Sequence, residues 1–203
     1  MSFSSEAFFN KTALIYTKSG KVIDLLNLDP KNVDIKDIAH ALSNMCRYNG
    51  HTSRFYSVAE HTLHLVYYAK EKGMSTRIQL GLLLHDAAEA YIGDMVYHLK
   101  KSNQQFMDLD KKISKQIFTK FGLELTEEEE NTIKSLDRRI CIDEMYVLMP
   151  MIDPALSSNG APIEPLQIST QLSSANICDC KRMFINEYNR IVQGDVNYAN
   201  RSF

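Results

Sequence analysis

The sequence has no long apolar run, little net charge and no leader-like beginning. No stretch of about 18 apolar residues occurs, so we expect no transmembrane helix. A formal net charge of −2 over 203 residues argues against a broad surface for a nucleic-acid polymer or a membrane. The first residues, MSFSSEAFFNKTALIY, lack the basic start and apolar core of a signal peptide. These absences favour a cytoplasmic protein with no membrane partner.

Paired cysteines are also missing. The four cysteines are scattered without a C-x-x-C spacing: Cys46, Cys141, Cys178 and Cys180. A metal clip by the last two would need side chains that do not face each other on a helix. Reduced thiols are the usual state in the cytoplasm, so neither a disulfide framework nor a cysteine-based zinc site is expected.

Apolar residues at helical spacing predict a mainly α fold, a helical bundle that follows a short β-hairpin. The length suits one domain, residues 1–203. The hairpin covers 12–26 and turns at Ser19-Gly20. Helices are predicted over 34–45, 57–72, 75–92, 103–121, 126–149 and 175–192. Capping boxes begin two of them, at Ser57 with Glu60 and at Thr126 with Glu129.

The C-terminal quarter is predicted to contain a long loop, a last helix and a loose tail. Residues 151–172 contain three prolines and an Asn-Gly pair, which predicts a long loop, either a lid or a subunit contact. Residues 173–203 are expected to form the last helix and then, from Gly194 onward, a loose tail. Neither part shows an internal repeat.

The stretch from Leu80 to Lys101, LGLLLHDAAEAYIGDMVYHLKK, combines a buried helical pattern with ionisable residues. Ionisable groups on a buried helix are costly unless they are paired or bind a metal. Glu89 follows His85 by four residues and Asp86 by three, so all three can face one site. The stretch is therefore expected to form the floor of a metal-dependent site.

His61, the pair His85-Asp86, and Asp137 lie on three separate predicted helices. Taken alone, each histidine is more typical of a hydrogen-bonded core residue. Together, imidazole and carboxylate groups suit a divalent Zn, Mn, Co or Fe ion with positions left for water and substrate. Consecutive helical residues point about 100° apart, so the spacing does not by itself bring His85 and Asp86 to one ion. The polar stretch RYNGHTSRFY (47–56) is either a solvated loop or a binding element.

The order H … HD … D resembles the HD-domain family of metal-dependent phosphohydrolases. Three blocks strengthen the resemblance: YSVAEHT (56–62), LLHDAAEAYIGD (83–94) and LDRRICIDE (136–144). They are similar to the branch that contains bacterial 5′-deoxyribonucleotidases and phage dATP triphosphohydrolases. The segment from SGKVIDLL to YSVAEH resembles the N-terminal part of the phage-type enzymes. The resemblance covers about residues 12–150.

The resemblance assigns roles residue by residue. It implies a set of metal ligands: His61, His85, Asp86 and Asp137. It implies two catalytic acids, one to position or activate the attacking water and one near that water or the phosphate: Glu89 and Asp94. It implies substrate contacts through an arginine, a tyrosine near sugar or base, and a lysine at distal phosphates: Arg47, Tyr48 and Lys100. Met95 to His98 replace prolines that relatives often carry, which alters the expected pocket wall.

The function implied is removal of dATP by hydrolysis to deoxyadenosine and triphosphate. Phosphoryl transfer needs a Lewis acid, an oriented water and cations against negative charge, and the residues above can supply these roles. The resemblance also implies a Zn, Co or Mn cofactor, a deoxynucleotide substrate, a homo-oligomer, and the host cytoplasm if the chain is viral. Two alternatives stay open: a 5′-nucleotidase on deoxynucleoside monophosphates, and a weakly active nucleotide-binding sensor.

Overall fold

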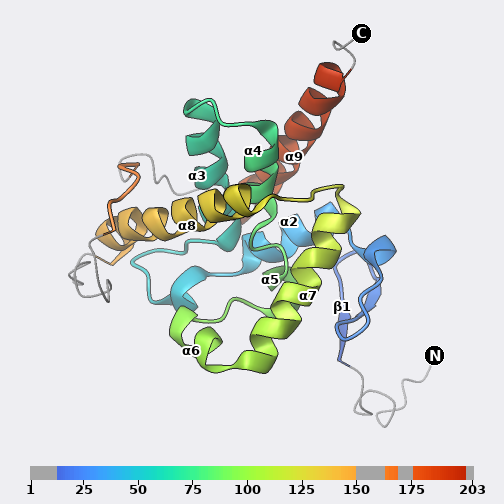
Figure 1. Ribbon diagram of the computed structural model, residues 1–203. Coiled ribbons are helices and arrows are strands. Elements are labelled where there is room, and N and C mark those ends of the chain that lie inside the picture. The colour runs from blue at the N-terminus through green and yellow to red at the C-terminus, as the bar shows by residue number, and fades with distance from the viewer. Residues whose placement is uncertain (1–12, 150–162, 169–175, 200–203) are drawn as a thin grey trace.

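The computed structural model describes residues 13–149, 163–168 and 176–199. Within these ranges the protein is mainly helical, with one two-stranded hairpin near the N-terminus, which confirms the predicted fold class (Figure 1). The first twelve residues, the loop positions 151–162 and 169–172, and the last four residues lie outside the described part. None of the helices in that part is long and apolar enough to cross a membrane.

The hairpin pairs β1 (Leu14–Tyr16) with β2 (Val22–Asp24) in antiparallel register, with Ile15 opposite Ile23. Gly20 has a φ of +85°, a left-handed conformation that glycine adopts without steric cost. The turn therefore lies where the Ser19-Gly20 pair predicts it. A 3₁₀ turn, η1 (Pro30–Asn32), leads from the hairpin into the bundle.

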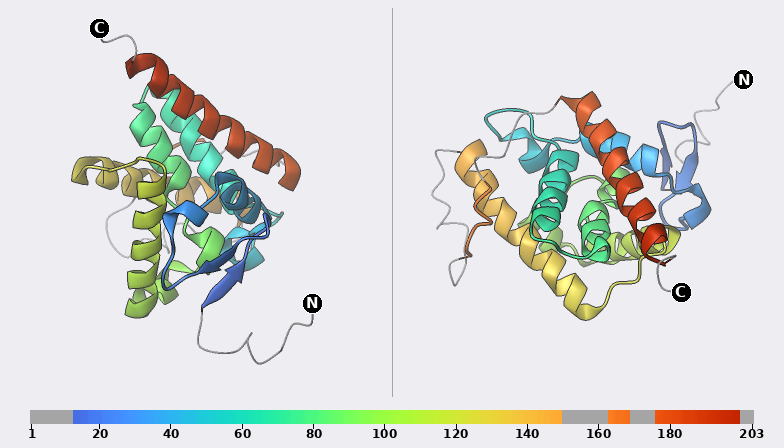
Figure 2. Two further views of the ribbon diagram at one scale, coloured as in Figure 1. Left: turned by 90° about the vertical axis from the view of Figure 1, so that its right-hand side faces the viewer. Right: turned by 90° about the horizontal axis from the view of Figure 1, so that it is seen from above.

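Four helices form the centre of the bundle: α2 (Ile35–Asn44), α3 (Val58–Glu71), α4 (Thr76–Leu84) and α9 (Ile177–Ala199). Helix α9 lies across the other three, which Figure 2 shows from two sides. The predicted capping box at Ser57 is present, with reciprocal bonds to Glu60. Fully buried side chains from all four helices fill the space between them: Ile38, Leu42, Leu65, Leu82, Phe184 and Ile191.

Helix α8 (Glu127–Leu148) crosses the front of this bundle in Figure 1 and begins with the predicted capping box at Thr126. Gly81 of α4 faces Ile133 of α8 so closely that an added Cβ would overlap the isoleucine side chain. Below α8 lie α6 (Tyr97–Ser102) and α7 (Gln104–Lys120). Helices α3, α4 and α8, which carry or precede the metal-ligand candidates, therefore pack directly on one another.

The prediction of a single helix over 75–92 is wrong for residues 85–88. Helix α4 ends at Leu84, and α5 (Glu89–Ile92) begins after a four-residue turn. In that turn, bonds of the i→i−3 type join Ala87 to Leu84 and Glu89 to Asp86, each 3.0 Å long. The carbonyl of Leu82, which would accept the N–H of Asp86 in a continuing α-helix, accepts His85 Nδ1 at 2.7 Å. The side chain of His85 thus takes a carbonyl that the helical ladder would use, and the chain continues with tighter i→i−3 bonds.

The C-terminal predictions are partly wrong. Helix α9 continues through Gly194 to Ala199, where a loose tail was expected. One glycine costs a helix only about 1 kcal/mol, which its neighbours can offset. In the predicted loop, residues 163–168 have neither helix nor strand, as expected. The N–H groups of Leu166 and Ile168 donate to Asp143 of α8 at 2.7 and 2.9 Å, so this piece is fixed to the bundle.

Candidate metal centre and substrate site

Two imidazoles and a carboxylate from separate elements meet at one point. His61 comes from the buried side of α3, and His85 and Asp86 come from the turn after α4. The Nε2 atoms of the histidines are 3.4 Å apart, and Asp86 Oδ2 lies 3.1 Å from that of His85 and 3.7 Å from that of His61. These three residues could hold a metal ion. The convergence occurs in the turn that interrupts the predicted helix.

Asp137 of α8 borders the same group. Its Oδ1 lies 3.1 Å from His61 Nε2 and 3.7 Å from His85 Nε2. Ligand atoms bound at about 2.1 Å in a tetrahedron lie about 3.4 Å from one another. The measured separations are of this size, so the position of Asp137 suits its predicted role as a further ligand.

The protons on the two imidazoles also fit a cation site. His61 Nδ1 lies 2.6 Å from Glu144 Oε1, and His85 Nδ1 donates to the carbonyl of Leu82. Because both acceptors take a proton from Nδ1, the two Nε2 atoms face each other with lone pairs whenever each ring carries a single proton. Such an arrangement needs a positive charge between the rings, and ligand histidines are usually held in this way.

The charges around the centre are tightly linked. Although burial opposes a charged imidazole, the carboxylates of Asp86 and Asp137 raise the pKa of His85 well above its usual value. Burial would raise the pKa of Asp86, but the neighbouring histidines hold it near 2. Without a metal, protons on the imidazoles take the place of the cation that the carboxylates require.

Glu144 is the site residue that sequence reasoning missed. It is fully buried on α8 and accepts hydrogen bonds from Tyr48 and Tyr56 in addition to its contact with His61. Burial disfavours its charge, yet Arg47 and His61 lower its pKa to about 2. A signal was present in the sequence, because Glu144 follows Asp137 by seven residues, two helical turns, and so lies on the same face.

Arg47 and Tyr48 begin η2 (Arg47–Gly50) and lie against the centre. Arg47 Nη1 is 3.5 Å from Asp86 Oδ2, and its Nε is 3.4 Å from Glu144 Oε2 without hydrogen-bond geometry. Tyr48 has a φ of +55° and donates to Glu144 Oε2 at 2.5 Å. This part of the 47–56 stretch therefore belongs to the site, whereas His51 is exposed.

The two predicted acids differ in burial. Glu89, at the start of α5, is buried, and its Oε2 has no hydrogen-bond partner among the described residues. Burial, together with the charges of Asp86 and Asp94, raises the pKa of Glu89 well above its usual value. Asp94 follows α5 and is partly buried, and its burial raises its pKa. A buried carboxyl with a raised pKa and an oxygen without a hydrogen-bond partner is typical of a functional position.

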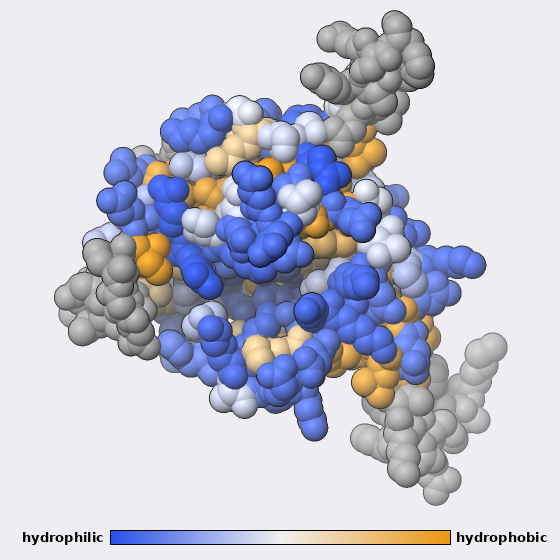
Figure 3. Space-filling model, viewed as in Figure 1, coloured by the Kyte–Doolittle hydropathy of each residue, from blue (hydrophilic) through white to orange (hydrophobic). Residues whose placement is uncertain are grey.

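Lys100 lies on α6, on the opposite side of the hollow from α8. Figure 3 shows the surface hollowed below α8, between that helix and the α6 region. The Nζ atom of Lys100 is 2.9 Å from Asp110 Oδ2 of α7. Burial opposes its charge, but Asp110 and, more weakly, Glu89 and Asp86 raise the pKa of Lys100. The charge of Lys100 therefore interacts with the acids of the site, while its ammonium group forms an ion pair with Asp110 of α7.

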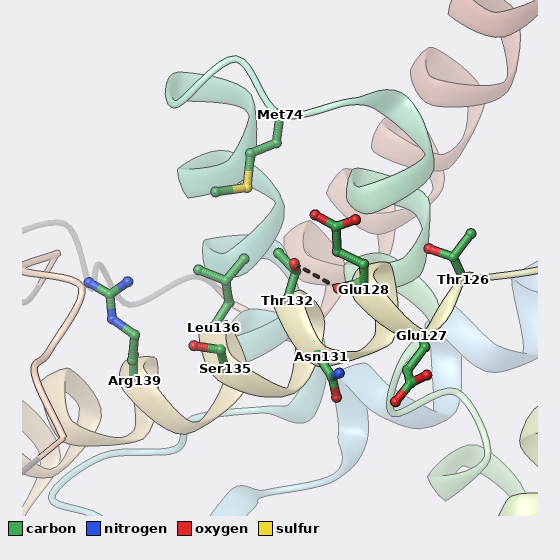
Figure 4. A pocket seen from close by; sticks show the side chains of 9 residues that line it. All are labelled: Met74, Thr126, Glu127, Glu128, Asn131, Thr132, Ser135, Leu136 and Arg139. Atoms are coloured by element: carbon green, nitrogen blue, oxygen red, sulfur yellow. Dashed lines mark hydrogen bonds between the residues drawn. The ribbon is translucent and has the colours of Figure 1, made fainter.

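A separate groove lies above α8, between that helix and the turn joining α3 to α4 (Figure 4). It is lined by a mixed set of side chains: Met74, Thr126, Glu127, Glu128, Asn131, Thr132, Ser135, Leu136 and Arg139. None of the predicted site residues is among them. The groove therefore lies apart from the group formed by His61, His85 and Asp86.

Comparisons with known proteins give relatives without a stated activity. No protein-family model matches the chain. An uncharacterized protein of Rhodobacter capsulatus is 37% identical over 110 residues, which are 52% of this chain and 56% of that protein. The uncharacterized protein YfdR of Escherichia coli is 35% identical over 111 residues, 55% of this chain and 60% of that protein. The chain therefore matches a little more than half the length of these curated relatives.

Proposed function

We propose that the protein is a metal-dependent phosphohydrolase of the HD-domain type that hydrolyses dATP to deoxyadenosine and triphosphate. One observation carries the proposal. Two imidazoles with engaged Nδ1 atoms present their Nε2 atoms to each other beside Asp86, and in the same site lies Glu89, whose buried Oε2 has no hydrogen-bond partner among the described residues. We also propose that the protein is a homo-oligomer. Its proposed location is the cytoplasm, which is the cytoplasm of the host if the chain is viral.

The residues fit a divalent Zn, Co or Mn ion. His61, His85, Asp86 and Asp137 would hold it, and the ion would supply a Lewis acid for a phosphate oxygen. Five carboxylates surround the site, those of Asp86, Glu89, Asp94, Asp137 and Glu144, and a cation would offset their mutual repulsion.

The remaining residues would act on water and phosphate. Glu89, with its raised pKa, is a stronger base than an ordinary glutamate and can take a proton from the attacking water. Arg47 can donate planar hydrogen bonds to phosphate oxygens, and Lys100 can place a point charge near the distal phosphates. A sensor would need the metal group and the cations but would have no need of Glu89, which favours an enzyme.

A 5′-nucleotidase acting on deoxynucleoside monophosphates would use the same centre. The two activities separate when protein loaded with Mn, Co or Zn is incubated with dATP and with dAMP and the products are identified. We expect deoxyadenosine and triphosphate from dATP. Phosphate from dAMP alone would overturn the proposal in favour of the nucleotidase, and a metal-loaded protein that hydrolyses neither would favour the sensor.

Lys100→Ala is expected to raise the KM for dATP about tenfold or more while the KM for dAMP changes little. A hydrogen bond to a charged group contributes about 1.5–3 kcal/mol, and only the triphosphate reaches the lysine in the proposed pose. Steady-state kinetics on both nucleotides measure the difference. Lys101→Ala is the matched control, because Lys101 Nζ lies over the ring of Tyr97. Equal effects of Lys100→Ala on both nucleotides would contradict a distal-phosphate role.

A further inference from the structure

We propose that Glu144 is a positioning residue that fixes the metal-binding imidazole of His61 and the substrate-binding turn Arg47–Gly50 in one arrangement. The inference rests on the proposed function and adds to it a physical link between metal binding and substrate binding. Glu144 would touch neither the metal nor the nucleotide. It would act through the residues that do.

The two oxygens of Glu144 serve different sides of the site. Oε1 lies 2.6 Å from His61 Nδ1 and accepts the hydroxyl of Tyr56 at 2.9 Å. Oε2 accepts the hydroxyl of Tyr48 at 2.5 Å and lies 3.4 Å from Arg47 Nε. One carboxylate therefore orients a ligand imidazole through one oxygen and the substrate turn through the other.

The charge of Glu144 is needed where it lies. Its side chain is fully buried, so no water can replace a lost partner, and a buried charge persists only when it is paired and hydrogen-bonded. An acceptor at Nδ1 also keeps the proton of His61 on that atom and leaves Nε2 free for a metal. A neutral side chain of the same size would weaken this preference.

The turn needs an external support. Tyr48, Asn49 and Gly50 have φ values of +55°, +52° and +79°, so two residues with a Cβ stand in the left-handed region consecutively. This conformation is uncommon outside glycine and persists where surrounding contacts impose it. The Tyr48 hydroxyl bond to Glu144 is such a contact, and it crosses 96 positions of sequence.

Arg47 is a second connection between the metal-binding residues and the substrate-binding turn. Its Nη1 lies 3.5 Å from Asp86 Oδ2, the same oxygen that faces both Nε2 atoms of the histidines. A metal bound at that oxygen would compete with Arg47 for it and leave Nη1 available to a phosphate. The charge of Glu144, 3.4 Å from Nε, would meanwhile keep the guanidinium at the site, so metal binding would prepare the arginine for substrate.

The test is Glu144→Gln, which keeps the shape and removes the charge. We expect the affinity for Co²⁺, measured by equilibrium dialysis and by its visible absorption, to fall about 10–100-fold, as for other residues that orient a ligand histidine. The KM for dATP should rise in the Co²⁺-saturated variant. Wild-type affinity for Co²⁺ together with a wild-type KM, whatever the unfolding temperature, would overturn the proposal.

Two further variants separate the halves of the link and keep the test valid if Glu144→Gln does not fold. Tyr48→Phe removes a donor to Oε2 only and should raise the KM with Co²⁺ affinity unchanged. Tyr56→Phe removes a donor to Oε1 only and should leave the KM unchanged; a rise equal to that of Tyr48→Phe would overturn the division. Co²⁺ affinity is read without turnover, so a wild-type protein that binds Co²⁺ but hydrolyses no nucleotide rejects the proposed function and leaves the role of Glu144 testable.

Discussion

Replacing Glu89 by glutamine is expected to lower the turnover of dATP by about 10²- to 10⁴-fold, the range typical of a lost general base. Glutamine keeps the size of the side chain and cannot take a proton from water. The metal content should stay at the wild-type level, because Glu89 is not one of the four proposed ligands. Turnover is measured on metal-saturated protein, with the metal content of the same sample determined by elemental analysis.

The stability of this variant gives a second, independent signature. Glu89 Oε2 is buried without a hydrogen-bond partner among the described residues. Burial and the charges of Asp86 and Asp94 oppose a negative charge on Glu89, so a neutral amide removes that repulsion and breaks no described bond of Oε2. The unfolding temperature of Glu89→Gln should therefore equal or exceed that of the wild type, as is common when a residue is kept for activity and not for stability.

Glu60→Gln is the matched control, a second buried glutamate with a different set of contacts. Its Oε1 accepts Arg54 Nη1 at 3.1 Å and its Oε2 accepts the N–H of Ser57 at 3.3 Å, so its charge is used in the structure. The unfolding temperature of this variant should be lower than that of the wild type, and its turnover should stay within about tenfold of the wild-type value. A Glu89→Gln protein with wild-type turnover would reject the catalytic role of Glu89, and one with reduced metal content would reject its separation from the ligands.

The parts of the fold that depend on local sequence were predictable. Ser57 and Thr126 begin α3 and α8 with capping boxes because each bonds residues three positions away. Asn103 caps α7 in the same local manner. The hairpin turn likewise depends on Gly20 and its immediate neighbours. For these elements the deciding interactions lie within one turn of the chain.

The interruption between α4 and α5 was not predictable in this way. The apolar pattern through Leu84, Ala87 and Ala88 continues at helical spacing, and all three side chains are buried as the pattern requires. The hydrogen-bond pattern nevertheless changes there: the Leu82 carbonyl accepts His85 Nδ1, the following backbone bonds are of the i→i−3 type, and the ring of His85 lies beside His61 of another helix. The spacing of apolar residues predicts which side chains are buried, but it does not predict which hydrogen-bond acceptor a polar side chain will use.

The candidate site likewise has residues that the sequence predicted and one that it did not. Spacing and resemblance identified His61, His85 and Asp86, and the fold brings them together. Glu144 lay inside a quoted block without a role, since its partners come from positions 83 to 97 residues away in the chain. A buried carboxylate that gathers distant donors leaves only one trace in the sequence, its helical spacing from Asp137.

His61→Ala is expected to abolish metal-dependent stabilisation. For the wild type, free metal at about 1,000 times its Kd should add about 4 kcal/mol to the free energy of unfolding, which is roughly 8–16 °C in unfolding temperature for a chain of this size. The variant loses one imidazole ligand and leaves Glu144 without its histidine partner. The unfolding temperature of the variant should be the same in the presence of metal and in the presence of a chelator. Its metal affinity should fall by more than the loss of about 10–100-fold that follows when a residue orienting a ligand histidine is replaced.

His64→Ala makes this expectation specific to the metal, because the two histidines lie one turn apart on the buried part of the same helix. His64 Nδ1 is 3.0 Å from the hydroxyl of Tyr56, and the two rings stack within 6° of parallel. Removing this ring should lower the unfolding temperature with and without metal by a similar amount, and so preserve the difference between the two conditions. If both variants lose that difference equally, the effect reports damage to α3 and not a ligand; if His61→Ala retains it, the cation lies elsewhere. A difference lost only with His61 therefore requires an ion held by that imidazole.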